Sequence, residues 1–187
     1  MTYFDLYGLP ETFRPDPAAL RAAYHRLSRE THPDFFAYAP ALEQQAALER
    51  ATRNTDAYRT LADFDRCLEY VLRLHGHLQA GETPALPPAF LLEMMDLNEQ
   101  VMDLETDPNP AAAARTAAAV AALAADLEAG IAPTLAAYPT LPPADRPAAL
   151  TRVLDYYLRR RYVLRLLTQV ARPADDAAQA ARRGVGG

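Results

Sequence analysis

Residues 16–34 read DPAALRAAYHRLSRETHPD, and this stretch decides how the first part of the chain folds. Asp16 followed by Pro17 is a typical helix start, because aspartate caps the first turn and proline fits the first helical position. Pro33 disfavours helical geometry at the residue before it, so the helix ends just ahead of it. The stretch therefore predicts one helix that ends in a rigid His-Pro-Asp turn.

The predicted helix has an apolar face and a basic face. At about 100° per residue, its apolar side chains fall together: Leu20, Ala23, Tyr24 and Leu27. The other face is nearly all of one sign, and its basic members are Arg21, His25, Arg26 and Arg29. A merely solvated face is one interpretation, but such faces normally mix signs. The single sign favours steering toward an acidic partner, with strong salt dependence.

The turn itself, His32-Pro33-Asp34, presents an imidazole and a carboxylate. Pro33 fixes one backbone angle and lacks an N–H, which holds its two neighbours in a repeatable geometry. A carboxylate presented in this way can pair with an arginine of a partner. A catalytic His–Asp pair is the alternative, and we disfavour it because no nucleophile or oxyanion donor is recognisable nearby.

The remainder of the chain predicts an all-α fold. Val and Ile are few, Ala, Leu, Arg and Glu are many, and the apolar spacing is helical. Prolines and glycines divide the chain into segments and set the predicted helix ends. A helix from about Phe64 should stop at Gly76, and one from Pro88 should end near Glu105. A third, from Ala111 to about Ala129, should be kinked or ended by Gly130 and Pro133. The predicted organisation is a hairpin of long helices with flanking short helices, then a linker, a three-helix bundle and a disordered tail. The hairpin with its short helices occupies 1–77, the linker 78–88, the bundle 89–171 and the tail 172–187.

The helix that begins near Pro88 has two apolar faces. One is an ordinary core stripe: Phe90, Met94, Leu97, Val101 and Leu104. Leu91, Leu92, Met95 and Met102 lie off this stripe, beside Asp96, Glu99 and Asp103. Burial of both faces is the alternative. The acids argue against it, because Asp and Glu are rarely buried without partners. An exposed apolar patch with an acidic rim is typical of a partner-binding site, and Met suits an adaptable surface.

Composition excludes several function classes for the 187 residues. A net charge of −5 argues against nucleic-acid binding. Cys67 is the single cysteine, so we expect no internal disulfide and no Cys-based metal site. The two histidines beside Gly76 are weak evidence for a metal site. We therefore expect no cofactor. We recognise no phosphate loop or nucleophile motif, so an enzyme is disfavoured. The start lacks signal-peptide features, and no apolar run approaches membrane-spanning length. A cytoplasmic monomer without a membrane or nucleic-acid partner is therefore expected.

These motifs together resemble a known family. A His-Pro-Asp turn after a basic helix is the mark of the J-domain. The opening Tyr3–Pro10 and the block Ala57–Leu61 resemble HscB-type J-proteins, as do Leu74-His75-Gly76 and Phe90–Leu97. The chain departs from the family pattern at Phe35, where a Lys is usual, and at Phe64, where a Pro is common.

The resemblance implies a co-chaperone that stimulates the ATPase of HscA, a DnaK-like chaperone, and brings it the iron–sulfur scaffold IscU. It implies chaperone binding by the His-Pro-Asp turn with the basic helix face. It also implies scaffold binding by Leu91, Leu92, Met95, Asp96, Glu99 and Asp103, together with an aromatic residue of the last helix. Tyr156 fits that aromatic position best, with Tyr157 adjacent. The alternative is a J-protein that serves another client of a DnaK-type chaperone. Without a Gly/Phe-rich segment or cysteine zinc repeats, the chain does not resemble a general DnaJ.

Overall fold

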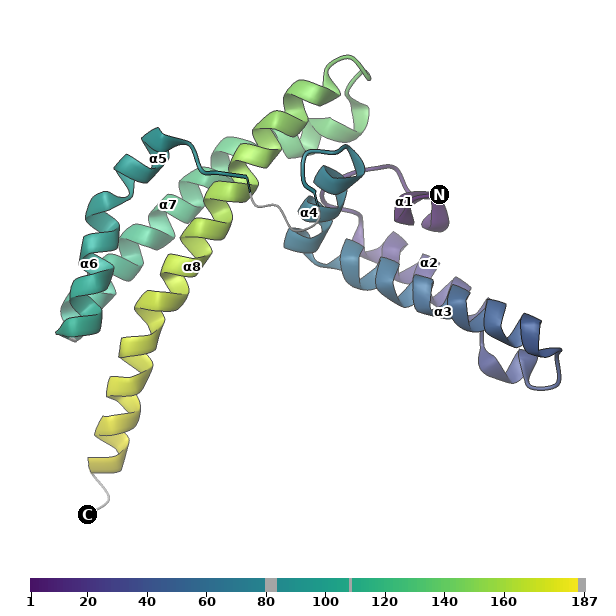
Figure 1. The fold of residues 1–187 in the computed structure, drawn as a ribbon, viewed down its shortest axis with the longest axis horizontal. Helices are drawn as coiled ribbons and strands as arrows, with labels where there is room; N and C mark the ends of the chain where they lie inside the picture. The colour runs from purple at the N-terminus through teal and green to yellow at the C-terminus, as the bar shows by residue number, and fades with distance from the viewer. Residues whose placement is uncertain (80–83, 108, 185–187) are drawn as a thin grey trace. The chain divides into compact units, whose positions relative to one another are not determined.

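The computed structural model describes residues 1–79, 84–107 and 109–184, and the side chains of these residues except Pro33 and 172–184. The regular structure of the described chain consists of helices, with no strand among the described residues, which confirms the predicted all-α class (Figure 1). Its α-helices are α1 (Tyr3–Tyr7), α2 (Pro17–Glu30), α3 (Ala41–Ala62), α4 (Phe64–Leu74), α5 (Pro88–Glu93), α6 (Met95–Thr106), α7 (Pro110–Ala137) and α8 (Arg146–Gly184). Two short 3-10 turns are η1 (Pro33–Phe36) and η2 (Tyr138–Thr140).

The chain divides into two compact units. Unit 1 consists of Met1–Ala80 and Thr134–Leu150, and unit 2 consists of Gly81–Pro133 and Thr151–Gly187. The predicted linker, 78–88, contains the first change of unit, and its residues 80–83 lie outside the described ones. The units differ from the predicted domains chiefly because Thr134–Leu150 falls inside the predicted bundle but belongs to unit 1. The predicted linker is also divided between the units, and the predicted tail belongs to unit 2.

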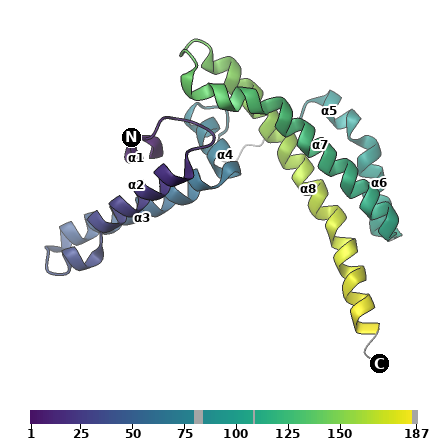
Figure 2. The ribbon, with the colours of Figure 1, turned by 180° about the vertical axis from the view of Figure 1, so that it is seen from behind.

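Unit 1 is built on the predicted hairpin, in which α2 and α3 run side by side (Figures 1 and 2). The Asp16 carboxylate accepts hydrogen bonds from the N–H groups of Ala18 and Ala19, so the predicted cap of α2 is confirmed. The end of α4 is also near its predicted position, with Gly76 in the left-handed region at φ 73°. Proline therefore sets the start of α2, and glycine sets the end of α4, as local chemistry requires.

Asn54 joins three helices inside unit 1. The side chain is 2% exposed, and its Nδ2 donates to the carbonyl of Tyr24 at 3.1 Å and to Oγ of Ser28 at 3.0 Å, both on α2. The hydroxyl of Tyr7 in α1 lies 2.9 Å from Oδ1 and 2.8 Å from the backbone oxygen of Asn54, and it donates to this pair of acceptors. Burial raises the pKa of Tyr7, which keeps the phenol protonated as a donor. The buried amide thus fixes α1 and α2 against α3.

Tyr138 explains why a late segment belongs to unit 1. Its ring is fully buried and lies against Phe13, with the centroids 4.7 Å apart. Its hydroxyl donates to Oε1 of Glu11 at 2.7 Å, and the same oxygen lies 2.8 Å from Nε2 of His75. An aromatic side chain with a satisfied hydroxyl is a favourable core element. Residues 134–150 therefore complete the core of the first 80 residues.

Unit 2 is a helical bundle in which α6, α7 and α8 lie side by side, preceded by the short α5 (Figures 1 and 2). Its buried cluster consists of Phe90, Met94, Val101, Leu104, Ala113, Val120, Val163, Leu166 and Val170. The helix that the sequence predicts from Pro88 to about Glu105 is interrupted at Met94, between α5 and α6.

Two helix ends differ from the predicted ones. α7 passes through Gly130 and Pro133 to Ala137, because Ile131 and Leu135 are buried on either side of the proline and their packing offsets the lost hydrogen bond. α8 extends to Gly184, so 172–184 is helical where the sequence predicts a disordered tail; the Ala, Arg and Gln in this segment are good helix formers. Residues 185–187 lie outside the described ones.

The segment Pro110–Thr140 is long and apolar enough to cross a membrane by length and composition alone, since an 18-residue window within it has a mean hydropathy of 1.4. The expectation that no run reaches this length was therefore wrong, because alanine counts as apolar. One stripe of α7 nevertheless packs in the bundle core through Ala113 and Val120. We therefore treat α7 as a bundle helix.

Cys67 yields a direct test of the core of unit 1. The thiol is 1% exposed, and burial, with the nearby carboxylates of Asp63 and Glu11, raises its pKa to about 12. The reactive thiolate is therefore about a thousandfold rarer than for an ordinary cysteine. We expect iodoacetamide to leave the native protein unmodified at neutral pH and to modify it fully in urea, as measured by intact mass. Rapid alkylation without denaturant would contradict this burial.

Candidate functional site

The His32-Pro33-Asp34 turn is exposed at the tip of the α2–α3 hairpin. The N–H of His32 donates to the carbonyl of Arg29 at 3.4 Å, and the N–H of Phe35 donates to the carbonyl of His32 at 3.1 Å. These two bonds join the end of α2 to η1. The side chains of His32 and Asp34 are 55% and 86% exposed, so both are presented to solvent.

The orientation of the imidazole follows from its contacts. Nδ1 of His32 accepts from the N–H of Asp34 at 3.3 Å and thereby caps η1. A neutral ring with this acceptor carries its proton on Nε2, where it is available to a partner. When protonated, the ring can instead pair through Nδ1 with the carboxylate of Asp34, which lies 3.5 Å away. In either state the turn offers a directed donor and an adjacent carboxylate.

The predicted basic face is also exposed. Arg21, His25, Arg26 and Arg29 all lie on the solvent side of α2. Among the described residues, none of the three arginines has a carboxylate within ion-pair distance. Because Arg29 lies in the last turn of α2 and its carbonyl accepts from His32, the basic face and the turn form one continuous surface.

The second predicted surface lies on α5 and α6. The exposed fractions of Leu91, Leu92 and Met95 are 43%, 68% and 60%, whereas the neighbouring Phe90 and Met94 are buried. Asp96, Glu99 and Asp103 are exposed beside them. The structure thus brings together six of the seven residues predicted for scaffold binding. We call these six residues the α5–α6 surface.

Tyr156 is the predicted member that the structure does not bring to this surface. It is 4% exposed, and its hydroxyl donates to Oε2 of Glu128 on α7. Burial, and then this hydrogen bond, raises the pKa of Tyr156. Tyr157, the neighbouring alternative, is also 4% exposed. A tyrosine with a satisfied hydroxyl is stable inside the bundle, so Tyr156 is a core residue of unit 2.

Three residues near the α5–α6 surface are absent from the predicted set. Met102 is 67% exposed and extends the exposed apolar stripe along α6. Its position off the core stripe in the sequence pattern already indicates that it lies on this exposed face. On α8, the guanidinium of Arg159 lies 5.0 Å from the centre of the Phe90 ring, and the ring of Tyr162 contacts Phe90 edge-on. Both contacts join residues far apart in the sequence, which no local pattern reveals.

Comparison with known proteins places this geometry in context. A family model described as the HSCB C-terminal oligomerisation domain matches residues 86–171. The co-chaperone protein HscB homolog of Ralstonia nicotianae is 42% identical over 103 residues, which are 54% of this chain and 58% of the relative, so the alignment spans just over half of that protein. The homolog of Burkholderia multivorans is 41% identical over 127 residues, which are 67% of this chain and 69% of the relative. The solved structure of chaperone HscB from Vibrio cholerae has a TM-score of 0.65 at 29% identity, and the match covers 95% of this chain and 99% of that one.

A helical hairpin with an exposed His-Pro-Asp tip, followed by a helical bundle, defines a J-domain protein with a C-terminal helical domain. The solved neighbours share this architecture over 99% of the Vibrio cholerae chain and 81% of a human HscB chain. The identity and coverage of the relatives then specify the group within this class. The chain belongs to the HscB co-chaperone family, which confirms the resemblance seen in the sequence.

Proposed function

We propose that this chain is a cytoplasmic co-chaperone of iron–sulfur cluster assembly. It stimulates the ATPase of a DnaK-like, HscA-type chaperone and delivers the scaffold IscU to it. The observation that carries the proposal is the exposed His32–Asp34 turn, which is continuous with an exposed basic helix face. Membership of the HscB family supports it, because the relatives are named co-chaperones.

On the chaperone side, the chain supplies contacts and no catalytic group. The exposed arginines of α2 attract an acidic surface and increase the rate of encounter. The Asp34 carboxylate then pairs with a cation of the chaperone, because charge-assisted hydrogen bonds are short and directional. His32 contributes its outward N–H beside that pair. ATP hydrolysis itself takes place in the chaperone.

On the client side, the α5–α6 surface fits a partner with an apolar patch and adjacent basic groups. Leu92 and Met95 are more than half exposed, so water is released when a partner covers them. The acids on α6 select for a partner of opposite charge at the edge of the contact. In this proposal, IscU is that partner.

The deciding experiment measures the steady-state ATPase rate of the same organism's HscA-type chaperone. The reactions contain the chaperone alone, with this protein, with IscU, and with both. Strong stimulation that is largest with both additions supports the whole proposal. Stimulation that IscU does not alter would retain the chaperone role and assign the protein to another client. A rate that stays basal in every mixture would contradict the proposal.

The double substitution Leu92→Ala/Met95→Ala tests the client surface. We expect it to weaken binding to IscU at least about tenfold, because two largely exposed apolar side chains lose the area they bury on docking. Titration calorimetry measures the affinity, and circular dichroism should show unchanged helicity. Leu74→Ala, at an exposed leucine of α4 in unit 1, is the matched control and should bind IscU normally. Loss of helicity in the double variant would instead mean that these residues support the fold.

A further inference from the structure

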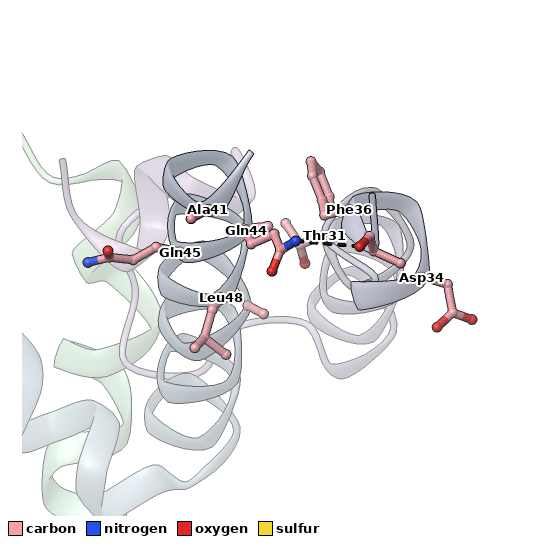
Figure 3. A pocket seen from close by; sticks show the side chains of 10 residues that line it. Thr31, Asp34, Phe36, Ala41, Gln44, Gln45 and Leu48 are labelled. Atoms are coloured by element: carbon pink, nitrogen blue, oxygen red, sulfur yellow. Dashed lines mark hydrogen bonds between the residues drawn. The ribbon is translucent and has the colours of Figure 1, made fainter. Parts of the chain in front are cut away.

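A pocket of about 570 Å³ opens between η1 and the first turns of α3 (Figure 3). Thr31, Asp34 and Phe36 line one side, and Ala47, Leu48 and Ala51 line the other. The pocket exists because the alanine side chains of α3 end at Cβ and leave the space beside η1 unfilled. Its size is within the range of protein sites that take a small ligand or a protruding side chain.

Hydrogen bonds hold the pocket open and leave its interior apolar. Nε2 of Gln44 donates to the carbonyl of Ala39 at 3.0 Å and to that of Ala37 at 3.4 Å, which ties the loop after η1 to α3 (Figure 3). The hydroxyl of Thr31 donates to the carbonyl of Leu27 at 2.8 Å, so this polar group is satisfied within its own helix. Among the residues that line the pocket in the described chain, Asp34 alone is charged.

One large apolar side chain of the pocket lining is largely exposed, and a second exposed one neighbours the lining residue Asp34 in the sequence. Leu48, which lines the pocket, is 66% exposed, and Phe35 next to Asp34 is 74% exposed. Exposed apolar groups gathered around a hollow are typical of a surface that another protein covers. In Figure 3 the Asp34 side chain points outward from the turn, away from the pocket interior.

The occupant follows from the position of Asp34. This residue belongs to the turn and is among the residues that line the pocket, but its carboxylate points outward. A cation that pairs with it therefore brings the adjoining part of the partner beside the pocket entrance. We propose that the pocket receives an apolar side chain of the chaperone, adjacent to the cation that pairs with Asp34. The inference rests on the proposed function and assigns the chaperone a second, apolar contact with this chain.

The substitution Leu48→Gln tests this contact. It removes an apolar wall at an exposed position, so the fold should be retained. We expect the concentration that gives half-maximal stimulation of the purified HscA-type chaperone to rise about tenfold, the loss expected for one buried apolar side chain. Leu42→Gln is the matched control, because Leu42 is an even more exposed leucine of α3 outside the lining, and it should stay close to wild type.

Two further measurements separate the pocket from the charged surface. Ala41→Met adds volume at the pocket lining and should weaken stimulation, whereas Ala46→Met, on the same helix outside the lining, should not. The effect of Leu48→Gln should be equal at low and high salt, since an apolar contact is not screened. The effect of Arg26→Ala should shrink at high salt.

The outcomes distinguish this inference from the proposed function. If the wild-type protein stimulates the chaperone, but Leu48→Gln and Ala41→Met behave like their controls, the pocket contact is overturned and the co-chaperone role stands. If the wild-type protein gives no stimulation, both fail. Weakening by both pocket variants, with unchanged circular dichroism and normal controls, supports the contact.

Discussion

His32→Gln is expected to abolish stimulation of the chaperone ATPase while the protein remains folded. The imidazole caps η1 through Nδ1 and directs its other nitrogen outward, and its ring contacts Phe35. Glutamine is longer and more flexible, and it is a poor helix cap, so neither the donor position nor the turn is retained. The side chain is more than half exposed, so the core does not depend on it. Steady-state ATPase assays over a range of co-chaperone concentrations measure the effect.

His77→Gln provides the matched control for this substitution. His77 follows Gly76 in the turn after α4 and belongs to neither proposed contact surface. It should stimulate the ATPase like the wild type. Full stimulation by His32→Gln would mean that the turn is not the contact with the chaperone.

Asn54→Ala is expected to cause the largest loss of stability among single polar substitutions in unit 1. The change leaves the Ser28 hydroxyl and the Tyr24 carbonyl without the buried amide, and it leaves the Tyr7 hydroxyl with only the backbone oxygen of residue 54 as an acceptor. Removing the central member of a buried hydrogen-bond network lowers the free energy of unfolding by about 3 kcal/mol. The midpoint of urea denaturation should therefore fall markedly.

The probe for this experiment must report on unit 1, because a chain of two units need not unfold in one step. Cys67 serves this purpose, since its thiol is buried in the core of unit 1 and becomes reactive when that core opens. Thr52→Ala, at an exposed position on the same helix, should shift the midpoint little. If Asn54→Ala and Thr52→Ala unfold at the same urea concentration, the buried amide does not stabilise the hairpin.

Local chemistry in the sequence was sufficient to predict much of the fold. The start of α2 follows from Asp16 and Pro17, and the end of α4 follows from Gly76. The exposed apolar side chains of the α5–α6 surface could be recognised because acids accompany them, and acids are not buried without partners. In each case the deciding interaction lies within a few residues of the position that it determines.

The features that escaped prediction depend on contacts between distant residues. The sequence pattern shows that Tyr156 lies on a helix with several apolar faces, but the hydrogen bond to Glu128 on α7 determines which face turns inward. No proline or glycine lies at the interruption at Met94, so the sequence gives no local signal for it. The role of Asn54 depends equally on α1 and α2, which approach it only after folding.

The discontinuity of unit 1 has a consequence for the order of events at the ribosome. Phe13 and Glu11 leave the ribosome early, but the ring that covers them, Tyr138, is synthesised more than a hundred residues later. The hairpin of α2 and α3 can form at once from neighbouring segments. The core beside Phe13 stays open until Thr134–Leu150 has been translated, so nascent chains that stop earlier expose an apolar surface that the complete protein hides. Translation pauses placed before residue 134 should therefore favour aggregation or capture by holding chaperones, whereas the released complete chain should not show this exposure.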